Sequence, residues 1–523
     1  MSEENTDQIN MFKELLSDGS TDSIKEFNIK KRILTAKLHL DVAPKNSEIM
    51  ATLSEDERAT FGRLLRSKPI RNLSGVSVVT VMTKPFPCPH GVCVFCPGGP
   101  RYGTPQSYTG KEPAARRASR NHYDPYRQVS ARLKHYTYLG YPPDKIELIV
   151  IGGTFTTLPK DYMRAFVTEL YRALNDFPSF NQRKATGTLQ EEKNENERAK
   201  ARCVAFAVET KPERCKEEDI KLLLELGVTR VEIGVQSLFD DVLKFANRGH
   251  DVKDVVQATS SLRQNGYKTG YHIMLNLPKS DIDRDKETIR RVYEDEDFMP
   301  DSLKIYPTLV LAGTGLFNLW KTGMYKVYRL EEISELISYA EATAPRWLRI
   351  MRIERDIPSD LIKDGVKYPN LRQLVLERMA KWHLKPNDIR SREIGHVKLE
   401  KRPEISMKRS NYRTSNGDEV FLSFEDTAND ALVGFLRLRL GDNAKEALVR
   451  ELHVYGEQSP LSVHTDTAFQ HHGFGSSLLG EAERIAGREY SKRKVKVISG
   501  VGVKDYYRKF GYRDDGQYVS KSL

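Results

Sequence analysis

The sequence lacks a long hydrophobic run. In 523 residues no apolar stretch approaches the ~18–20 residues that a helix needs to cross a bilayer, and the mean hydropathy is −0.55. The first ten residues, MSEENTDQIN, are polar and acidic, which argues against a secretory signal. These absences predict a chain without a membrane segment and with a cytoplasmic location.

Cysteine is scarce, and acidic residues are outnumbered by basic ones. Five cysteines, an odd number, argue against a disulfide framework. With 83 Lys and Arg against 72 Asp and Glu, the net charge is +11. This excess favours a polyanionic partner such as nucleic acid, although it fits a merely basic enzyme equally well. The length predicts about three domains.

Short apolar runs alternate with helical patterns between residues 76 and 344. This alternation is typical of an α/β fold with a parallel sheet, and five or six units predict a full or partial β/α barrel. Chemistry in such barrels gathers at the carboxyl ends of the strands. The expected strands cover residues 76–82, 146–151, 204–208, 231–235, 272–275 and 303–310.

The remaining chain divides into three parts. Residues 1–75 are basic and helical in pattern, and we expect them to contact a nucleic acid. Residues 345–392, rich in Arg and Pro, predict a connector, and residues 393–523 predict a second, α+β domain. The polar stretch 181–200 inside the barrel predicts a solvated loop insertion without chemistry.

Three cysteines, Cys88, Cys93 and Cys96, lie on one short loop after the first expected strand. Three thiolates on a tight loop can hold three corners of a 4Fe–4S cluster and leave the fourth iron open. A structural zinc site completed by His90 is the alternative. The spacing alone does not separate the two.

A second motif lies near the carboxyl end of the sequence. Gln470-His-His-Gly473-Phe474-Gly475 precedes a helical stretch, and Tyr506 follows the next expected strand. The amino end of a helix favours a pyrophosphate, and glycines allow close approach. The order of elements resembles the Gcn5-related acetyltransferases, which bind acetyl-CoA between splayed strands. The tyrosine could equally be part of the core.

The first half of the chain resembles the radical S-adenosylmethionine (SAM) enzymes. Besides the cysteine loop, Gly152-Gly153-Thr154 ends the second expected strand. The usual spacing in that superfamily is Cys-x3-Cys-x2-Cys, whereas this chain has Cys-x4-Cys-x2-Cys. The resemblance implies that Gly152, Gly153, Thr154, Glu209 and Gln236 bind SAM. Glu209 and Gln236 could instead be ordinary hydrogen-bonded strand ends.

Taken together, the two halves resemble the catalytic subunit of Elongator and its stand-alone prokaryotic relatives. The strings Cys-Pro-Gly-Gly-Pro at 96–100 and Arg450-Glu-Leu-His-Val-Tyr455 add to this match. The resemblance implies formation of 5-carboxymethyluridine at the wobble position of tRNA, from acetyl-CoA by radical SAM chemistry. The alternatives are a protein lysine acetyltransferase with a structural cluster and a non-catalytic scaffold.

The same resemblance implies a set of acetyl-CoA contacts. Lys145 and Tyr506 are the implied catalytic residues, although Lys145 also fits a solvated charge beside a strand. We expect the C-terminal domain to pack against the open end of the barrel, with these two side chains facing one cleft. The implied acetyl-CoA residues are Lys145, Arg450, Glu451, Leu452, His453, Gly473, Phe474, Gly475 and Tyr506.

Basic residues interleaved with tyrosines follow the cysteine loop, a pattern that suits the unstacked bases of a tRNA anticodon stem-loop. A solvated basic surface is the alternative. No cysteine lies at 306–308 or 388–391, where some relatives hold zinc, so we expect no zinc there. A homodimer is allowed. The expected tRNA contacts are Arg101, Lys111, Arg116, Arg117 and Arg120, with a second patch at Arg346, Arg349, Arg352 and Arg355.

Overall fold

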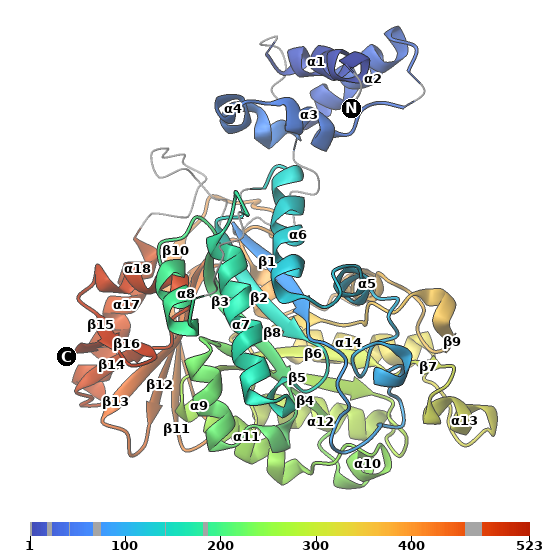
Figure 1. The fold of residues 1–523 in the computed structure, drawn as a ribbon. Coiled ribbons are helices and arrows are strands. Elements are labelled where there is room, and N and C mark those ends of the chain that lie inside the picture. Colours follow the sequence, from blue (N-terminus) through green and yellow to red (C-terminus); the bar gives the residue numbers. More distant parts are fainter. Residues whose placement is uncertain are drawn as a thin grey trace.

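The structure is a computed structural model of the 523-residue chain (Figure 1). It describes residues 3–17, 23–40, 42–65, 75–141, 143–180, 187–455 and 473–523. Gln470, the first residue of the acetyl-CoA motif, lies outside these residues.

Four helices form the N-terminal part, as the sequence predicts. They enclose a small apolar core that includes Phe12, Phe27, Ile49 and Leu65. A capping box at Ser23 starts α2, since the Ser23 side chain and Glu26 satisfy each other's backbone N–H groups. In Figure 1 this bundle lies at one end of the molecule, beside α6. The helices are α1 (Glu3–Ser17), α2 (Ile24–Lys37), α3 (Asn46–Thr52) and α4 (Glu55–Leu65).

A seven-stranded parallel sheet forms the middle of the chain, in the order β1-β2-β3-β4-β5-β6-β8. Among the described residues β1 and β8 do not pair, so the barrel is partial, one of the two forms that the sequence predicts. The strands are β1 (Val76–Met82), β2 (Lys145–Ile151), β3 (Arg202–Thr210), β4 (Arg230–Gln236), β5 (Lys268–Leu275), β6 (Ser302–Pro307) and β8 (Arg349–Arg352).

Helices cover the outer face of this sheet, and alternation along each strand explains why. On β2 the side chains of Ile146, Leu148 and Val150 are fully buried in the main core, whereas Lys145 and Glu147 are half-buried on the inner face. The helices of this part of the chain, among which α13 packs on β7 instead, are α5 (Pro113–Arg120), α6 (Pro125–Tyr138), α7 (Lys160–Asn175), α8 (Leu189–Asn196), α9 (Glu217–Glu225), α10 (Asp240–Phe245), α11 (Val252–Gln264), α12 (Ile282–Glu294), α13 (Gly315–Lys321) and α14 (Leu330–Thr343).

Part of the expected loop insertion is a packed helix. Within residues 187–200, α8 packs on α7, and Asn196 is fully buried. The Asn196 amide donates to Asn175 Oδ1 at 2.8 Å and to the Ala201 carbonyl at 3.1 Å. The prediction of a solvated loop was wrong for these residues, because a polar sequence can be buried when each amide finds a partner.

The expected connector contributes to the first sheet. Its strand β8 pairs with β6, so residues 345–392 are more than a linker. The short strand β9 pairs with β7 beside the barrel. The elements of this part are β7 (Val310–Leu311), β9 (Ile362–Asp364), α15 (Leu371–Lys381) and α16 (Ile389–Arg392).

The C-terminal part is a second seven-stranded sheet in the order β10-β11-β12-β13-β14-β16-β15. Its strands β13 and β14 are parallel, and all other pairs are antiparallel. The elements are β10 (Ile405–Arg413), β11 (Gly417–Asp426), β12 (Ala431–Gly441), β13 (Glu446–Val454), α17 (Phe474–Arg484), β14 (Lys494–Val497), α18 (Lys504–Arg508), β15 (Arg513–Asp515) and β16 (Tyr518–Ser522).

Candidate active site

One cavity of about 2090 Å³ runs through the inside of the partial barrel and onto the C-terminal domain. Its wall includes the three loop cysteines at one end and the glycine motif of α17 at the other. Lys145 and Tyr506 both line it. The two motifs that the sequence predicts for different cofactors therefore share one continuous space.

The cysteine loop carries three free thiols held by polar neighbours. Arg248 Nη1 lies 3.3 Å from Cys93 Sγ, and Gln106 Nε2 lies 3.1 Å from Cys96 Sγ. Burial and the neighbouring Cys96 raise the pKa of Cys88 to about 11. A bound cationic metal centre would offset this effect, because thiolates are the ligating form.

The described structure does not gather the three thiols into a closed zinc site. A tetrahedral zinc with Zn–S bonds of ~2.3 Å would bring its sulfur ligands within about 3.8 Å of one another. Among the described residues the three cysteine Sγ atoms do not all lie within 4.8 Å of one another.

The strand ends beside this loop have the backbone geometry that a ligand site requires. Gly152 has φ +129°, and a Cβ atom there would lie 2.5 Å from Thr83 Oγ1. Thr154 Oγ1 lies 4.0 Å from Cys88 Sγ. Gln236 has φ +69°, which is strained for a non-glycine residue, and its buried Oε1 has no hydrogen-bond partner in the described structure. This strain and the free oxygen are consistent with the SAM contact expected of Gln236.

The other end of the cavity lies at the start of α17. Gly473 caps this helix, and Phe474 and Gly475 begin it. A Cβ atom at Gly475 would lie 2.5 Å from the hydroxyl oxygen of Tyr506, so only glycine allows this tyrosine to approach the helix. Gly473, Phe474 and Gly475 line the cavity at the amino end of α17, where the helix dipole suits a pyrophosphate.

The strands beside α17 separate where the motif begins. The pairing of β13 with β14 ends at Val449 and Val497, so the edge formed by Glu451, Leu452 and His453 is open on that side. All three residues line the cavity. This is the splayed arrangement that the sequence predicts for acetyl-CoA.

Arg450 has a different environment from its neighbours. A β-bulge leaves it unpaired with β12, since Arg437 pairs with Glu451 and Leu438 pairs with Val449. Its guanidinium is fully buried and bonds to Asp301 at 2.6 and 2.7 Å and to Glu419 at 3.0 Å. The side chain is therefore engaged between the two sheets, and only its backbone remains for a cofactor.

This contact shows where the C-terminal domain packs. Asp301 directly precedes β6, and the Tyr267 carbonyl, which also accepts from Arg450 at 2.8 Å, directly precedes β5. Gly502 lies against Arg202, the first residue of β3. The domain thus packs on the amino ends of the strands, whereas the cysteine loop follows the carboxyl end of β1. The expectation that the domain would cover the open end was wrong, because the buried Arg450–Asp301 pair fixes it at the opposite edge.

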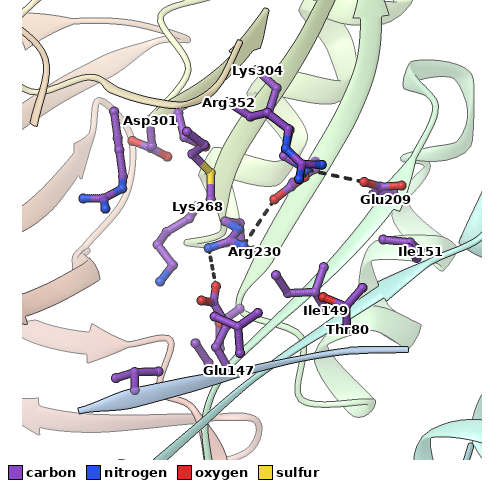
Figure 2. Close-up of a pocket in the computed structure, with 18 of the residues that line it drawn as sticks. Thr80, Glu147, Ile149, Ile151, Glu209, Arg230, Lys268, Asp301, Lys304 and Arg352 are labelled. Atoms are coloured by element: carbon purple, nitrogen blue, oxygen red, sulfur yellow. Dashed lines mark hydrogen bonds and ion pairs between the residues drawn. The ribbon is translucent and has the colours of Figure 1, made fainter. Parts of the chain in front are cut away.

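Charged side chains line the cavity between these two edges (Figure 2). Arg230 pairs with Glu147 at 2.6 Å and with Glu232 at 3.2 Å. Lys304 forms ion pairs with Glu232 and, at 3.4 Å, with Glu209 Oε1. Full β/α barrels fill this space with branched apolar residues. A charged wall here indicates a chamber for a polar ligand.

Sequence reasoning missed this wall apart from Glu209. A signal was present, because Arg230 and Glu232 alternate with apolar residues in β4, and the apolar face is the one that helices cover. Burial opposes the charge of Glu232, but Lys304, His272 and Arg230 outweigh it and hold the pKa of Glu232 well below its usual range. The His272 ring nitrogen lies 2.9 Å from Glu232 Oε2.

The basic residues after the cysteine loop are mostly exposed. Arg116 and Arg120 lie on the solvent side of α5, whose Ala115 and Ala118 are buried. Arg117 is half-buried and lines the cavity. Arg101 and Lys111 are exposed.

The second basic patch expected from the sequence is not free. Arg346 pairs with Glu425 and Asp430, both at 2.7 Å. Arg349 and Arg352 pair with Glu393 and Asp356, and Arg355 donates to the Ser107 carbonyl at 2.6 Å. These arginines are engaged within the protein, and their contact with tRNA stays a prediction.

The fold and the site define a radical SAM half-barrel joined to an acetyltransferase domain. Residues 87–292 match the Radical SAM superfamily, 300–381 its C-terminal domain, 9–73 the ELP3 N-terminal domain and 380–512 the acetyltransferase (GNAT) family. The radical SAM part implies a 4Fe–4S cluster and SAM, and the GNAT part implies acetyl-CoA.

Full-length relatives identify the family. The tRNA uridine(34) acetyltransferase of Methanocaldococcus infernus is 46% identical over 498 residues, 92% of either chain. Human Elongator complex protein 3 is 42% identical, over 95% of this chain and 93% of its own length. A structure of Methanocaldococcus infernus Elp3 lacking residues 1–46 matches with a TM-score of 0.75 and 42% identity, over 86% of this chain and all of that one. The chain belongs to the Elongator complex protein 3 family.

Proposed function

We propose that this chain carboxymethylates the wobble uridine of tRNA at carbon 5, with acetyl-CoA as the carbon source. The observation that carries the proposal is the single cavity that joins the cysteine loop to the acetyl-CoA motif. A protein acetyltransferase would need only the second of these. The names of the relatives, which include tRNA uridine(34) acetyltransferases, support tRNA as the substrate.

The chain's residues divide the work between the two ends of the cavity. Cys88, Cys93 and Cys96 would hold the cluster, which with SAM supplies a 5′-deoxyadenosyl radical when bound. At the other end Tyr506 and the start of α17 would hold acetyl-CoA.

The expected acceptor is an anticodon stem-loop. Arg117 at the cavity rim, with Arg116 and Arg120 on the adjoining solvent side, would contact its phosphates. The basic N-terminal helices are a second proposed contact. In the part of the chain that the structure describes, no helix is long and apolar enough for a membrane. A cytoplasmic location and a homodimer remain predictions, the latter testable by light scattering.

The test is a labelled reconstitution. Protein loaded with iron and sulfide is incubated anaerobically with reductant, SAM, tRNA and acetyl-CoA deuterated on its methyl group, and nucleosides are analysed by mass spectrometry. We expect 5-carboxymethyluridine with two deuterium atoms and 5′-deoxyadenosine with one. Acetyl-lysine on added peptides, with no modified uridine, would instead favour the protein acetyltransferase.

A further inference from the structure

Lys304 occupies the middle of the charged wall. It lies on β6 opposite His272 of β5, between the strand ends that face SAM and the edge that faces acetyl-CoA. Its ammonium bonds to Glu232 and to Glu209, and in the described structure it has no third hydrogen-bond partner. A lysine ammonium carries three donors. One N–H is therefore available to a ligand in the cavity that Lys304 lines.

The surroundings keep this side chain charged and in place. Burial alone lowers the pKa of Lys304, but Glu232, Tyr306 and Glu209 outweigh it and raise that pKa above its usual value. Glu209, Glu232 and His272 have ligand atoms within 4.8 Å of one another, a group that could attract a metal ion. Because Lys304 pairs with both carboxylates, its ammonium already supplies the positive charge there.

The chemistry of uracil determines what such a donor can do. The reacting atom, carbon 5, has a hydrogen-bonding group on only one side, the carbonyl oxygen O4, since carbon 6 carries only hydrogen. O4 is therefore the hydrogen-bonding group through which a protein can hold carbon 5 most directly. Cytosine presents an amino donor at the same place.

We propose that the free N–H of Lys304 donates to O4 of the wobble base and selects uridine over cytidine. This inference rests on the proposed function and names its specificity-determining residue. The lysine ammonium can only donate hydrogen bonds. The amino group of cytosine is also a donor, so the two groups would face each other without forming a hydrogen bond. Glu209 and Glu232 hold the ammonium in place. The choice of uridine over cytidine therefore depends on the wobble base and not on the rest of the tRNA.

The experiment measures binding of three anticodon stem-loops to the full-length protein. They carry uridine, cytidine or no base at the wobble position, and EDTA is present so that no metal ion replaces a removed ammonium. We expect the parent to prefer uridine over cytidine by roughly 5- to 150-fold, the range for a buried polar group that loses its hydrogen-bond partner. In Lys304→Met the ratio should fall to about 1, with unchanged affinity for the abasic loop.

Two further variants keep the test informative if Lys304→Met folds poorly. Lys304→Gln offers an amide carbonyl and should accept cytidine. The double variant Lys304→Met with Glu232→Gln removes one of the two carboxylate charges that Lys304 balances. Lys268→Met, on the same wall beside Glu451 at 3.5 Å, is the matched control and should keep the parent ratio.

A parent without preference, or Lys304 variants that retain it, would overturn the inference. Either result leaves the proposed function intact if labelled 5-carboxymethyluridine forms. Conversely, loss of preference in the variants together with no modified nucleoside in the parent would support Lys304 and refute the proposed function.

Discussion

Cys88, Cys93 and Cys96 share a loop, whereas Cys203 is buried at the other end of the sheet, in β3. We predict that anaerobic incubation with iron and sulfide gives one 4Fe–4S cluster per chain, with its visible absorption and about four irons. Replacing the three loop cysteines with Ala should abolish both signals, because no other thiol lies on that loop. Cys203→Ala is the control and should bind iron as the parent does. Stoichiometric zinc without iron would contradict the prediction.

Glu451 gives a pH-dependent contribution to stability. Burial opposes its charge, but Lys268 and Arg437 outweigh it and lower the pKa of Glu451 to about 2. A lowered carboxyl pKa stabilises the fold fully above about 4.5, and this contribution is lost as the pH falls towards 2.

Glu451→Gln should therefore destabilise the protein at neutral pH, by an amount on the order of 3 kcal/mol at ~1.36 kcal/mol per pKa unit. Thermal unfolding of parent and variant between pH 7 and pH 3 measures this. The two curves should approach each other as the pH falls below about 4.5. A difference that grows on acidification would show that Glu451 is not held ionised.

At the scale of the elements, α17 and α18 meet where Gly475 faces Tyr506. Gly475→Ala should displace the tyrosine and weaken acetyl-CoA binding by roughly tenfold, measured by calorimetry, since its Cβ would lie 2.5 Å from the hydroxyl. Tyr506→Phe removes that oxygen, so the double variant should bind better than Gly475→Ala alone. If the losses of acetyl-CoA affinity in Gly475→Ala and Tyr506→Phe simply add in the double variant, the two residues act independently, contrary to this prediction.

Helix α5 presents Arg116 and Arg120 to solvent. Replacing both with Ala should weaken tRNA binding and flatten the log–log salt dependence by about 1 for each phosphate that the protein no longer binds. Filter binding over a range of salt concentrations measures both effects. Lys398 and Lys401, exposed elsewhere on the chain, give a control pair of equal charge. If replacing Lys398 and Lys401 weakens tRNA binding as much as replacing Arg116 and Arg120, then α5 contributes only to the overall positive charge of the protein.

The elements show how far the sequence could be interpreted. Periodicity predicted β1 with the bounds that the structure has, because this strand buries an apolar face. It missed β10, whose side chains are mostly exposed and give no apolar alternation. The cofactor motifs were predictable because glycine and cysteine are required at fixed positions.

The charged wall was much harder to predict. Arg230, Glu232 and Lys304 are spaced like a solvated strand face, and only the curvature of the half-barrel turns that face toward the cavity. The packing of the C-terminal domain was also hidden, since it depends on Asp301 and Arg450, which are 149 residues apart in sequence. Pairing over such a separation leaves no local pattern.

For the whole molecule, this buried ion pair joins the two sheets. Asp301→Asn should destabilise the protein by about 3–5 kcal/mol, because it leaves the buried Arg450 partly unpaired. Calorimetry should show the single unfolding transition separating into two as the domains uncouple. Adding Arg450→Met should recover part of the loss, since it removes the uncompensated charge. If Asp301→Asn unfolds like the parent, other contacts hold the domains together.

The proposed acetyl-CoA and SAM sites lie at the amino and carboxyl ends of the same parallel strands. Strand β2 has seven residues, which at ~3.3 Å each span roughly 20 Å from one end to the other. If Tyr506 holds the thioester as proposed, we predict that the acetyl group reaches the SAM end on the long, flexible pantetheine arm. Acetyl thioesters of short thiols carry the same reactive methyl group but lack this reach. We therefore expect the length of the strands to select the acyl carrier.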